Sequence, residues 1–448
     1  MSASGDRLAA DLLRPLNRTG GLWYVFVAFL GTIVACGLFA WFFQMWRGFG
    51  LTGIRWPVYW GFLITDFVFW IGISHAGTLI SAILRLVNAG WRRPVTRCAE
   101  VITAFALMIG GLFPIIHLGK PWLFFWLVPY PNQRLIWPNF RSPLVWDFFA
   151  ISTYLTGSLL FLFLPMIPDF ALIRDRSTGM KKTIYGALAL GWRGTTHQWH
   201  RLETAMQIMA IAIIPVAVSV HTIVSFDFSM APVPMWHSTI FGPYFVAGAI
   251  FSGIAGLIIA MAALRKILKL HDYLEDIHFE NLGKLLLTMS LLWGYFTFNE
   301  RLTTWYGNHT AEINTFQVTQ TGTFSPLFWT MVLVNFVLPV VILSIRRFRT
   351  VTGCVIASCG VVIGMWLERY LIVVPSLAHK YLPYSWGTYA PRPTEIVITL
   401  STFAAMALLY TLFAKFIPII SIWEMRAGEH TPIENAAVPE RRLGETHA

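Results

Sequence analysis

This 448-residue sequence has few charged residues: only 12% are Asp, Glu, Lys or Arg, about half the usual share for a soluble domain. Apolar residues make up 56% of the chain and aromatic residues 15%. This composition excludes a soluble globular enzyme, a disordered chain and a secreted disulfide scaffold. It favours an all-α polytopic membrane protein, because a helix satisfies its own backbone hydrogen bonds inside lipid.

Cysteine is also scarce, and its spacing excludes common redox sites. The four cysteines, Cys36, Cys98, Cys354 and Cys359, form no C-x-x-C pair and no C-x-x-C-H haem-attachment motif. Scattered in or beside apolar runs, they do not match iron–sulfur ligand spacing. We expect no signal peptide either, since residues 1–20 are polar and the first apolar run is long enough to remain in the membrane. The cysteines are interpreted as small packing residues.

Long apolar runs, by contrast, recur along the whole chain. The longest gap between them, 169–202, is polar and basic, and it predicts a loop with a short interfacial helix near 181–190. Ten runs are long enough to cross a bilayer, and they predict ten transmembrane helices at about 20–46, 58–84, 98–118, 143–168, 203–226, 240–264, 284–306, 326–345, 351–375 and 394–418.

The basic residues set the predicted orientation. The formal net charge is +11, which suggests nucleic acid or anionic lipid as a partner, and the positions of the charges decide between them. With the N-terminus inside, 24 of the 33 lysines and arginines fall in cytoplasmic segments and 8 in outer segments. This asymmetry predicts that both termini are cytoplasmic, and the spread over many loops argues against nucleic-acid binding. The outer segments 119–142, 227–239 and 376–393 are rich in Pro, Trp and Tyr, which predicts an aromatic belt or a docking surface.

Ionisable residues inside spans are costly, so each is a functional candidate. Eight or nine of the twelve fall in the outer half of the predicted membrane, whereas a random scatter would divide them evenly. Structural roles remain open for some: Glu395 suits a helix N-terminus, Glu203 lies near the inner surface, and four others can pair across helices. The twelve are Asp66, His75, His117, Asp147, Glu203, His221, Asp227, Glu300, Arg301, Glu368, Arg369 and Glu395, and the four are Glu300, Arg301, Glu368 and Arg369.

Helical geometry separates two of these candidates. Asp66 and His75 are nine residues apart, which is half a turn out of phase and roughly 14 Å along a helix. They are therefore expected to face different neighbours. Each is expected to take part either in proton conduction or in interhelical hydrogen bonds. A single haem held by two histidines from different spans also stays open, because His75, His117 and His221 lie on three spans.

Four candidates near one membrane face are not explained by these structural roles. They are His117, Asp147, Asp227 and Arg369. Quinol binding supplies a chemical reason for them, because a histidine and a carboxylate can hydrogen-bond to the two oxygens of the ring. They can also accept the two protons that quinol oxidation releases. A secondary transporter and a structural anchor for partner subunits are the rival interpretations.

Several motifs resemble the NrfD, or polysulfide-reductase, membrane-subunit family. These are the runs 74–85 (SHAGTLISAILR), 117–121 (HLGKP) and 142–147 (SPLVWD). The runs 220–227 (VHTIVSFD) and 299–308 (NERLTTWYGN) resemble the quinol-binding integral subunit ActC of bacterial alternative complex III, and the sister subunit ActF is similar. The resemblance extends over nearly all ten spans.

The resemblance implies a fold and an assembly. Two four-helix bundles are expected at 58–226 and 240–375, with flanking segments at 1–57 and 394–448. The implied protein carries no redox cofactor, binds menaquinol or ubiquinol near the periplasmic face of the bacterial inner membrane, and passes electrons to an iron–sulfur subunit. Multihaem cytochrome c subunits and a second NrfD-like membrane subunit are the further partners, in a respiratory or photosynthetic complex. A membrane subunit of a polysulfide-reductase-type complex is the alternative.

The resemblance also implies residue roles. His117 and Asp147 are expected to contact the quinol head, with Asp227 and Arg369 close by. A coupled proton route is expected to draw on other buried polar residues, namely Asp66, His75, Glu203, His221, Glu300, Arg301 and Glu368.

Overall fold

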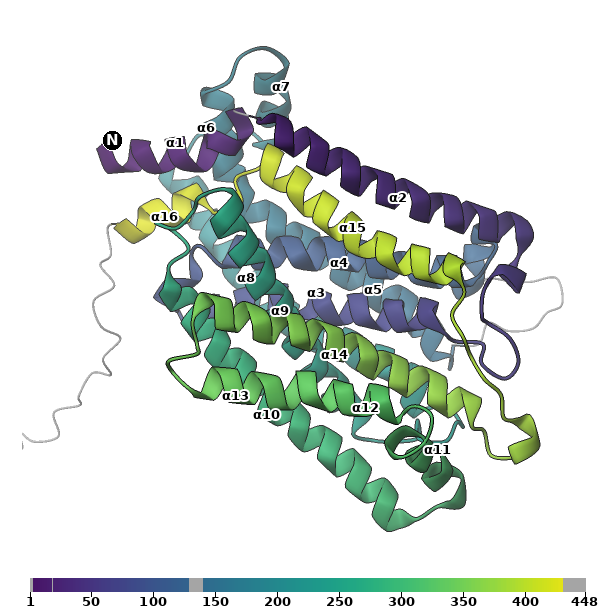
Figure 1. Ribbon diagram of the computed structural model, residues 1–448. Coiled ribbons are helices and arrows are strands. Elements are labelled where there is room, and N and C mark those ends of the chain that lie inside the picture. Colours follow the sequence, from purple (N-terminus) through teal and green to yellow (C-terminus); the bar gives the residue numbers. More distant parts are fainter. Residues whose placement is uncertain (1–2, 18, 129–139, 430–448) are drawn as a thin grey trace, which may run out of the picture.

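The structure, a computed structural model, describes residues 3–17, 19–128 and 140–429, and the predicted all-helical membrane fold is confirmed in this part of the chain (Figure 1). Its described residues contain no strand beyond one isolated bridge between Arg55 and Val58. Nine of its helical segments are long and apolar enough to cross a membrane: α2 (Gly21–Arg47), α3 (Phe62–Leu86), α4 (Thr96–His117), α5 with α6 (Pro143–Asp175), α8 (Thr196–Ser229), α9 (Phe241–Ile267), α12 with α13 (Ser325–Ser344), α14 (Val351–Ala378) and α15 (Pro393–Phe416).

The tenth expected span, 284–306, lies within α10 (Asp276–Gly307), which is less apolar than the other nine. Its 32 residues extend roughly 48 Å, more than a bilayer core requires, and it packs against α9, α13 and α14. The short helices α1 (Ala3–Asn17) and α16 (Ile422–Glu429), near the two ends of the chain, also touch each other. An even number of crossings between them accounts for this contact, so ten spans stay a prediction that the arrangement favours.

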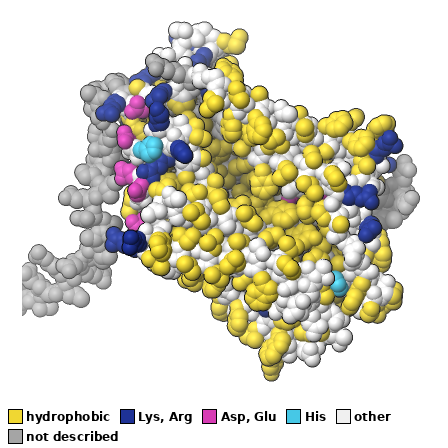
Figure 2. All heavy atoms as spheres, viewed as in Figure 1, with side chains coloured by type: hydrophobic (Ala, Val, Ile, Leu, Met, Phe, Trp, Pro, Cys, Tyr) yellow, Lys and Arg dark blue, Asp and Glu magenta, His cyan; other side chains and the backbone are white. Residues whose placement is uncertain are grey.

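The two ends of the bundle differ in composition. The tail end carries α1, α16 and α7 (Gly179–Leu188), the helix expected near 181–190. The loop end carries η1 (Phe49–Leu51), α11 (Thr310–Gln320) and η6 (Pro383–Ser385) (Figure 1). Charged side chains gather at both ends and leave an apolar belt between them (Figure 2), as a lipid-facing surface requires. Part of the expected outer segment 119–142 and the tail beyond residue 429 lie outside the described residues.

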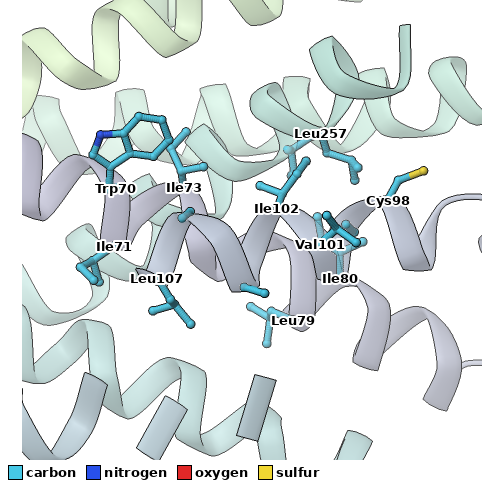
Figure 3. Packing of buried hydrophobic residues seen from close by; sticks show 14 of the residues in the cluster. Trp70, Ile71, Ile73, Leu79, Ile80, Cys98, Val101, Ile102, Leu107 and Leu257 are labelled. Atoms are coloured by element: carbon cyan, nitrogen blue, oxygen red, sulfur yellow. The ribbon is translucent and has the colours of Figure 1, made fainter. Parts of the chain in front are cut away.

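Helix α3 is the centre of the fold, because it packs against α4, α8, α9 and α14. Close packing with α4 depends on Gly77, where a Cβ atom would lie 1.9 Å from the Ala99 carbonyl oxygen. Small residues allow such approaches between helices in lipid. Thr103 Oγ1 joins the same two helices by donating to the Ser74 carbonyl (2.7 Å) and accepting from the Thr78 N–H (2.8 Å). Around these contacts, apolar side chains of α3, α4 and α9 interdigitate (Figure 3).

The segment from α12 (Ser325–Val332) to α13 (Leu338–Ser344) is interrupted by a π-helical turn at Leu333–Val337. Pro339 follows this turn and has no N–H to donate to the Asn335 carbonyl four residues earlier. Ser290 of α10 donates to that carbonyl instead, at 2.7 Å. The proline thus frees a backbone acceptor that joins α10 to its neighbour.

The tail end is fastened by the helix α16. The buried carboxylate of Glu424 pairs with Arg85 and with Arg92 (3.1 Å), which flank the connection between α3 and α4. Trp423 Nε1 donates to the Pro165 carbonyl at 2.8 Å. These contacts tie α16 to the end of α3, to the connection between α3 and α4, and to the turn at Pro165 between α5 and α6.

Replacing Glu424 with glutamine is expected to release α16 from the bundle. Burial raises the pKa of the Glu424 carboxyl, but Arg85 and Arg92 outweigh it, so the pKa stays below its usual value. The ion pairs therefore stabilise the fold at neutral pH and are lost as pH falls through that lowered pKa. We expect at least tenfold faster tryptic cleavage at Arg426 in E424Q, because two half-buried arginines lose their buried counter-charge.

Mass spectrometry of timed digests measures this cleavage rate. The variant E280Q is the matched control, because Glu280 pairs with Lys284 (2.9 Å) at the surface and exposed pairs contribute little. Equal cleavage rates in E424Q and E280Q would contradict the proposed fastening of α16.

Candidate functional site

Two carboxyl groups meet at the loop end of the bundle. Asp147 lies near the beginning of α5 and Asp227 near the end of α8, and both side chains are buried. They are hydrogen-bonded to each other. Because an ionised carboxylate only accepts hydrogen bonds, this contact requires a shared proton. Oδ1 of each group accepts no hydrogen bond from any other donor in the described residues.

His117 ends α4 at the same end of the bundle, and α4 packs against α5. Its Nδ1 is buried without a partner, and its ring faces Phe49 of η1, with centroids 6.1 Å apart. Phe49 also packs on Gly119, where the φ angle is +71° and a Cβ atom would lie 2.5 Å from the Phe49 ring. Only glycine meets both the backbone and the space requirements there. The site thus has an aromatic wall beside an open imidazole nitrogen.

The segment that carries Phe49 is held by the beginning of α15. Arg392 Nη1 donates to the Gly50 carbonyl at 2.7 Å. The buried Glu395 carboxylate accepts from the Gly53 N–H (2.6 Å), and it also accepts from the Tyr389 hydroxyl (2.6 Å) and the Arg392 N–H (3.0 Å). The expected helix N-terminal role of Glu395 is therefore part of a wider set of contacts that positions η1 beside His117.

Arg369, the fourth candidate, lies in a different set of contacts. Its guanidinium is buried over the Phe245 ring, 4.5 Å from the centroid, and pairs with the neighbouring Glu368 at 3.3 Å. Nη1 and Nη2 have no hydrogen-bond partner, and His221 packs against the same Phe245 ring, with centroids 6.0 Å apart. Among the described residues, no contact joins Arg369 to Asp147 or Asp227. The structure therefore brings the two aspartates together and leaves Arg369 against α9.

Two histidines that the sequence keeps apart meet between α3 and α8. The rings of His75 and His221 have centroids 4.5 Å apart, too close for an iron atom with both as axial ligands. His75 Nδ1 is 2.9 Å from the Ile71 carbonyl and Nε2 is 2.6 Å from the Ala217 carbonyl. Carbonyl oxygens only accept, so both contacts are hydrogen bonds only when the ring carries two protons. His221 has no partner on either nitrogen, so this pair suits proton exchange.

Asp66 lies on the other side of α3, as the nine-residue spacing predicts. It is buried and accepts hydrogen bonds from Trp366 Nε1 of α14 (2.8 Å) and Thr399 Oγ1 of α15 (2.5 Å). These contacts meet the expectation of interhelical hydrogen bonds. Glu203 is exposed on α8, and no ion pair to it occurs among the residues that the structure describes.

A second polar region occupies the loop end between α9, α10, α11 and α14. Glu368 Oε1 accepts from Trp293 Nε1 (2.6 Å) and from the Tyr244 hydroxyl. Glu300 accepts from Ser238 Oγ (2.8 Å), and Arg301 donates to Thr319 Oγ1 (3.2 Å). A cavity of about 30 Å³ lies among these groups, which is room for ordered water. Within the described residues, Glu368–Arg369 is the one ion pair among the four charges expected to pair across helices, and it joins consecutive residues of α14 instead of two helices.

Several buried polar residues escape the sequence prediction. Glu100 accepts a hydrogen bond from Ser81 Oγ at 2.5 Å. It is the third residue of the expected span 98–118, so the sequence did show an ionisable residue inside a span at this position. Arg97 and Asp169 form a buried ion pair at 2.6 Å just outside the expected spans. Phe49, Tyr244 and Trp293 carry no sequence signal, because buried aromatic residues are ordinary in a membrane protein. The described residues contain no group of three or more His, Cys, Asp or Glu side chains placed to hold a metal.

Comparison with known proteins gives consistent results across most of the chain. The family model described as polysulphide reductase, NrfD, matches residues 50–379. A putative dimethyl sulfoxide reductase membrane subunit from Halobacterium salinarum is 24% identical and covers 90% of this chain and 93% of its own. A selenate reductase subunit from Mesobacillus selenatarsenatis is 24% identical (89% and 94% covered). An Hdr-like menaquinol oxidoreductase integral membrane subunit from Archaeoglobus fulgidus is 22% identical (91% and 95% covered).

Proposed function

Because this chain belongs to the NrfD polysulphide reductase family, we propose that it is the quinol-binding membrane subunit of an oxidoreductase complex. The hydrogen-bonded pair Asp147–Asp227, with one open oxygen on each carboxyl, carries the proposal. The unpartnered Nδ1 of His117 at the same end supports it. The names of the three relatives, two reductase subunits and a menaquinol oxidoreductase subunit, agree with this role. We propose menaquinol as the substrate, with ubiquinol as the alternative.

In the proposed reaction, both hydroxyl groups of the quinol are hydrogen-bonded before electrons leave. One donates to an open oxygen of the aspartate pair and the other to His117 Nδ1. Oxidation removes two electrons, which pass to an iron–sulfur subunit, and two protons. The aspartate pair, which holds one proton at rest, accepts a second, and neutral His117 accepts the other. The ring is released as the quinone.

The proposed proton route uses the buried polar groups unequally. The rings of His75 and His221 are in contact, and His221 also packs against the Phe245 ring that contacts Arg369. Glu300, Arg301 and Glu368 line a cavity with room for water. Asp66 has its hydrogen bonds satisfied by α14 and α15, and Glu203 is exposed, so we propose that these two contribute least.

Two assemblies fit a subunit of this kind. We propose alternative complex III of a bacterial inner membrane, with an iron–sulfur subunit, multihaem cytochrome c subunits and a second NrfD-like membrane subunit. In that assembly the loop end faces the periplasm. The alternative is a polysulfide-reductase-type complex with an extracytoplasmic molybdenum enzyme. The subunits that copurify with this chain from its native membrane distinguish the two.

Photoaffinity labelling with an azido-menaquinol tests the proposed site. The purified complex is illuminated with the probe, and labelled peptides are identified by mass spectrometry. We expect labels at the loop ends of α4, α5 and α8, which unlabelled menaquinol suppresses. Labelling spread evenly over the apolar belt would contradict the proposed site. Solute uptake by the chain alone in liposomes would instead support a secondary transporter.

A further inference from the structure

The tail end contains an open pocket that quinol chemistry does not use. Its volume is about 210 Å³, and it lies between α6 (Ile167–Asp175), the loop 189–195, the beginning of α8 and α16. Three arginines and three tryptophans line it, which are Arg174, Arg193, Arg426, Trp192, Trp199 and Trp423. We propose that this pocket binds the phosphate headgroup of an anionic phospholipid.

The charges of the pocket favour an anion. Its two acidic residues already have cationic partners: Asp169 pairs with Arg97 at 2.6 Å, and Asp175 accepts two hydrogen bonds from Arg174 (2.8 and 3.2 Å). Arg193 lines the pocket with an exposed side chain, and no ion pair to it occurs in the described part of the chain. After these pairings the pocket keeps an excess of positive charge, and guanidinium groups bind phosphate by charge-assisted hydrogen bonds.

The indole rings give the pocket a continuous aromatic wall. Trp192 and Trp199 are in edge contact with centroids 4.9 Å apart, and Trp199 lies 5.3 Å from Trp423 of α16. Tryptophan concentrates at the depth of the lipid headgroups, where its ring is apolar and its N–H is polar. This wall therefore belongs to the membrane–water boundary.

Helix α7 gives independent evidence for the same depth. Met180, Ile184 and Leu188 repeat every four residues and are all exposed, at 80%, 52% and 36%. Residues at this spacing share one helix face, and Lys181 lies beside this face while Lys182 lies on the opposite one. An exposed apolar stripe beside a lysine is typical of a helix lying in the bilayer interface. Because α7 packs against α6 and leads into the loop 189–195 (Figure 1), the pocket opens at headgroup depth.

These two observations together favour a phospholipid over a free anion. A soluble phosphate would use the arginines but gain nothing from the exposed stripe of α7. A phosphatidylglycerol molecule presents one negative phosphate at the depth of the pocket, with its acyl chains in the adjacent apolar layer. Because Trp423 and Arg426 belong to α16, a bound headgroup also helps to hold this helix in place.

Native mass spectrometry of the delipidated complex tests the proposal. Phosphatidylglycerol, phosphatidylcholine and inorganic phosphate are added in separate titrations, and bound species are counted by mass. We expect retention of phosphatidylglycerol only, and about fivefold weaker binding in R193Q, since one basic residue near an anionic headgroup is worth roughly 1 kcal/mol. The control is R346Q, which removes an exposed arginine of the loop 345–350 outside the pocket.

Three results would overturn the proposal. Equal binding of phosphatidylcholine would remove the role of negative charge, and equal binding of inorganic phosphate would identify a site for free anions. Equal effects of R193Q and R346Q would show that the pocket binds phosphatidylglycerol no more tightly than the surface outside it. Since none of these measurements involves quinol turnover, their outcome is independent of the proposed function.

Discussion

Replacing His117 or Asp147 with alanine is expected to lower quinol oxidation at least about 100-fold, the effect of losing one proton-accepting group. Each variant removes a hydrogen bond to the quinol ring and the acceptor for one of its protons. His117 ends α4 and Asp147 lies near the beginning of α5, both at the loop end, and both have an atom with no hydrogen-bond partner. Since these atoms satisfy no other part of the protein, their removal is expected to leave assembly intact.

Quinol-dependent reduction of the terminal acceptor by the purified complex measures this effect. The set of copurified subunits and the size-exclusion elution are compared with the unmodified complex, so that loss of assembly is separated from loss of turnover. The variant H309A is the control, because His309 is an exposed histidine before α11 at the same end of the bundle. Normal turnover in both H117A and D147A would contradict the proposed site.

The second prediction concerns Asp147 and Asp227 as a single acid. The variants D147N and D227N are each expected to lower turnover about 100-fold, and the double variant is expected to cost no more than the larger single effect. Two groups that share one proton titrate as a pair, so the loss of either partner removes the function of both. Asparagine preserves the size of each side chain and leaves the packing of α5 on α8 intact.

A double-mutant cycle on kcat and kcat/KM provides the measurement. If the two effects multiply to about 10,000-fold, the aspartates act independently and the shared-proton interpretation is wrong. Unchanged turnover in D227N alone would assign proton acceptance to Asp147 by itself. The pH dependence of kcat supplies a further check. The paired acid contributes two limbs to this pH profile, and we expect one of them to disappear in either single variant.

Features that repeat along one segment were predictable from the sequence. Low charge and long apolar runs predicted membrane helices, and the basic gap at 169–202 predicted the short helix α7. The nine-residue spacing of Asp66 and His75 predicted that they face different neighbours, as their contacts with α15 and α8 confirm. Each of these properties follows from local periodicity, which a single helix expresses without reference to its partners.

The position of each polar residue along its own helix was predictable too, but its neighbours on other helices were not. The sequence grouped Asp147, Asp227 and Arg369 near one membrane face, because each lies toward the same end of its span. The structure joins the aspartates, which are 80 positions apart, and turns Arg369 toward Phe245 and Glu368. Depth depends on the distance along one helix, whereas a neighbour depends on how helices rotate and pack against one another.

By itself, then, the sequence determined a helical membrane protein with buried polar groups concentrated toward one end. Only the tertiary structure decided which of those groups meet: the aspartate pair, the adjacent rings of His75 and His221, and Glu424 between two arginines. Each of these contacts joins segments far apart in the chain. The aspartate pair depends on the packing of α5 against α8, and the histidine pair on that of α3 against α8, which no local pattern encodes.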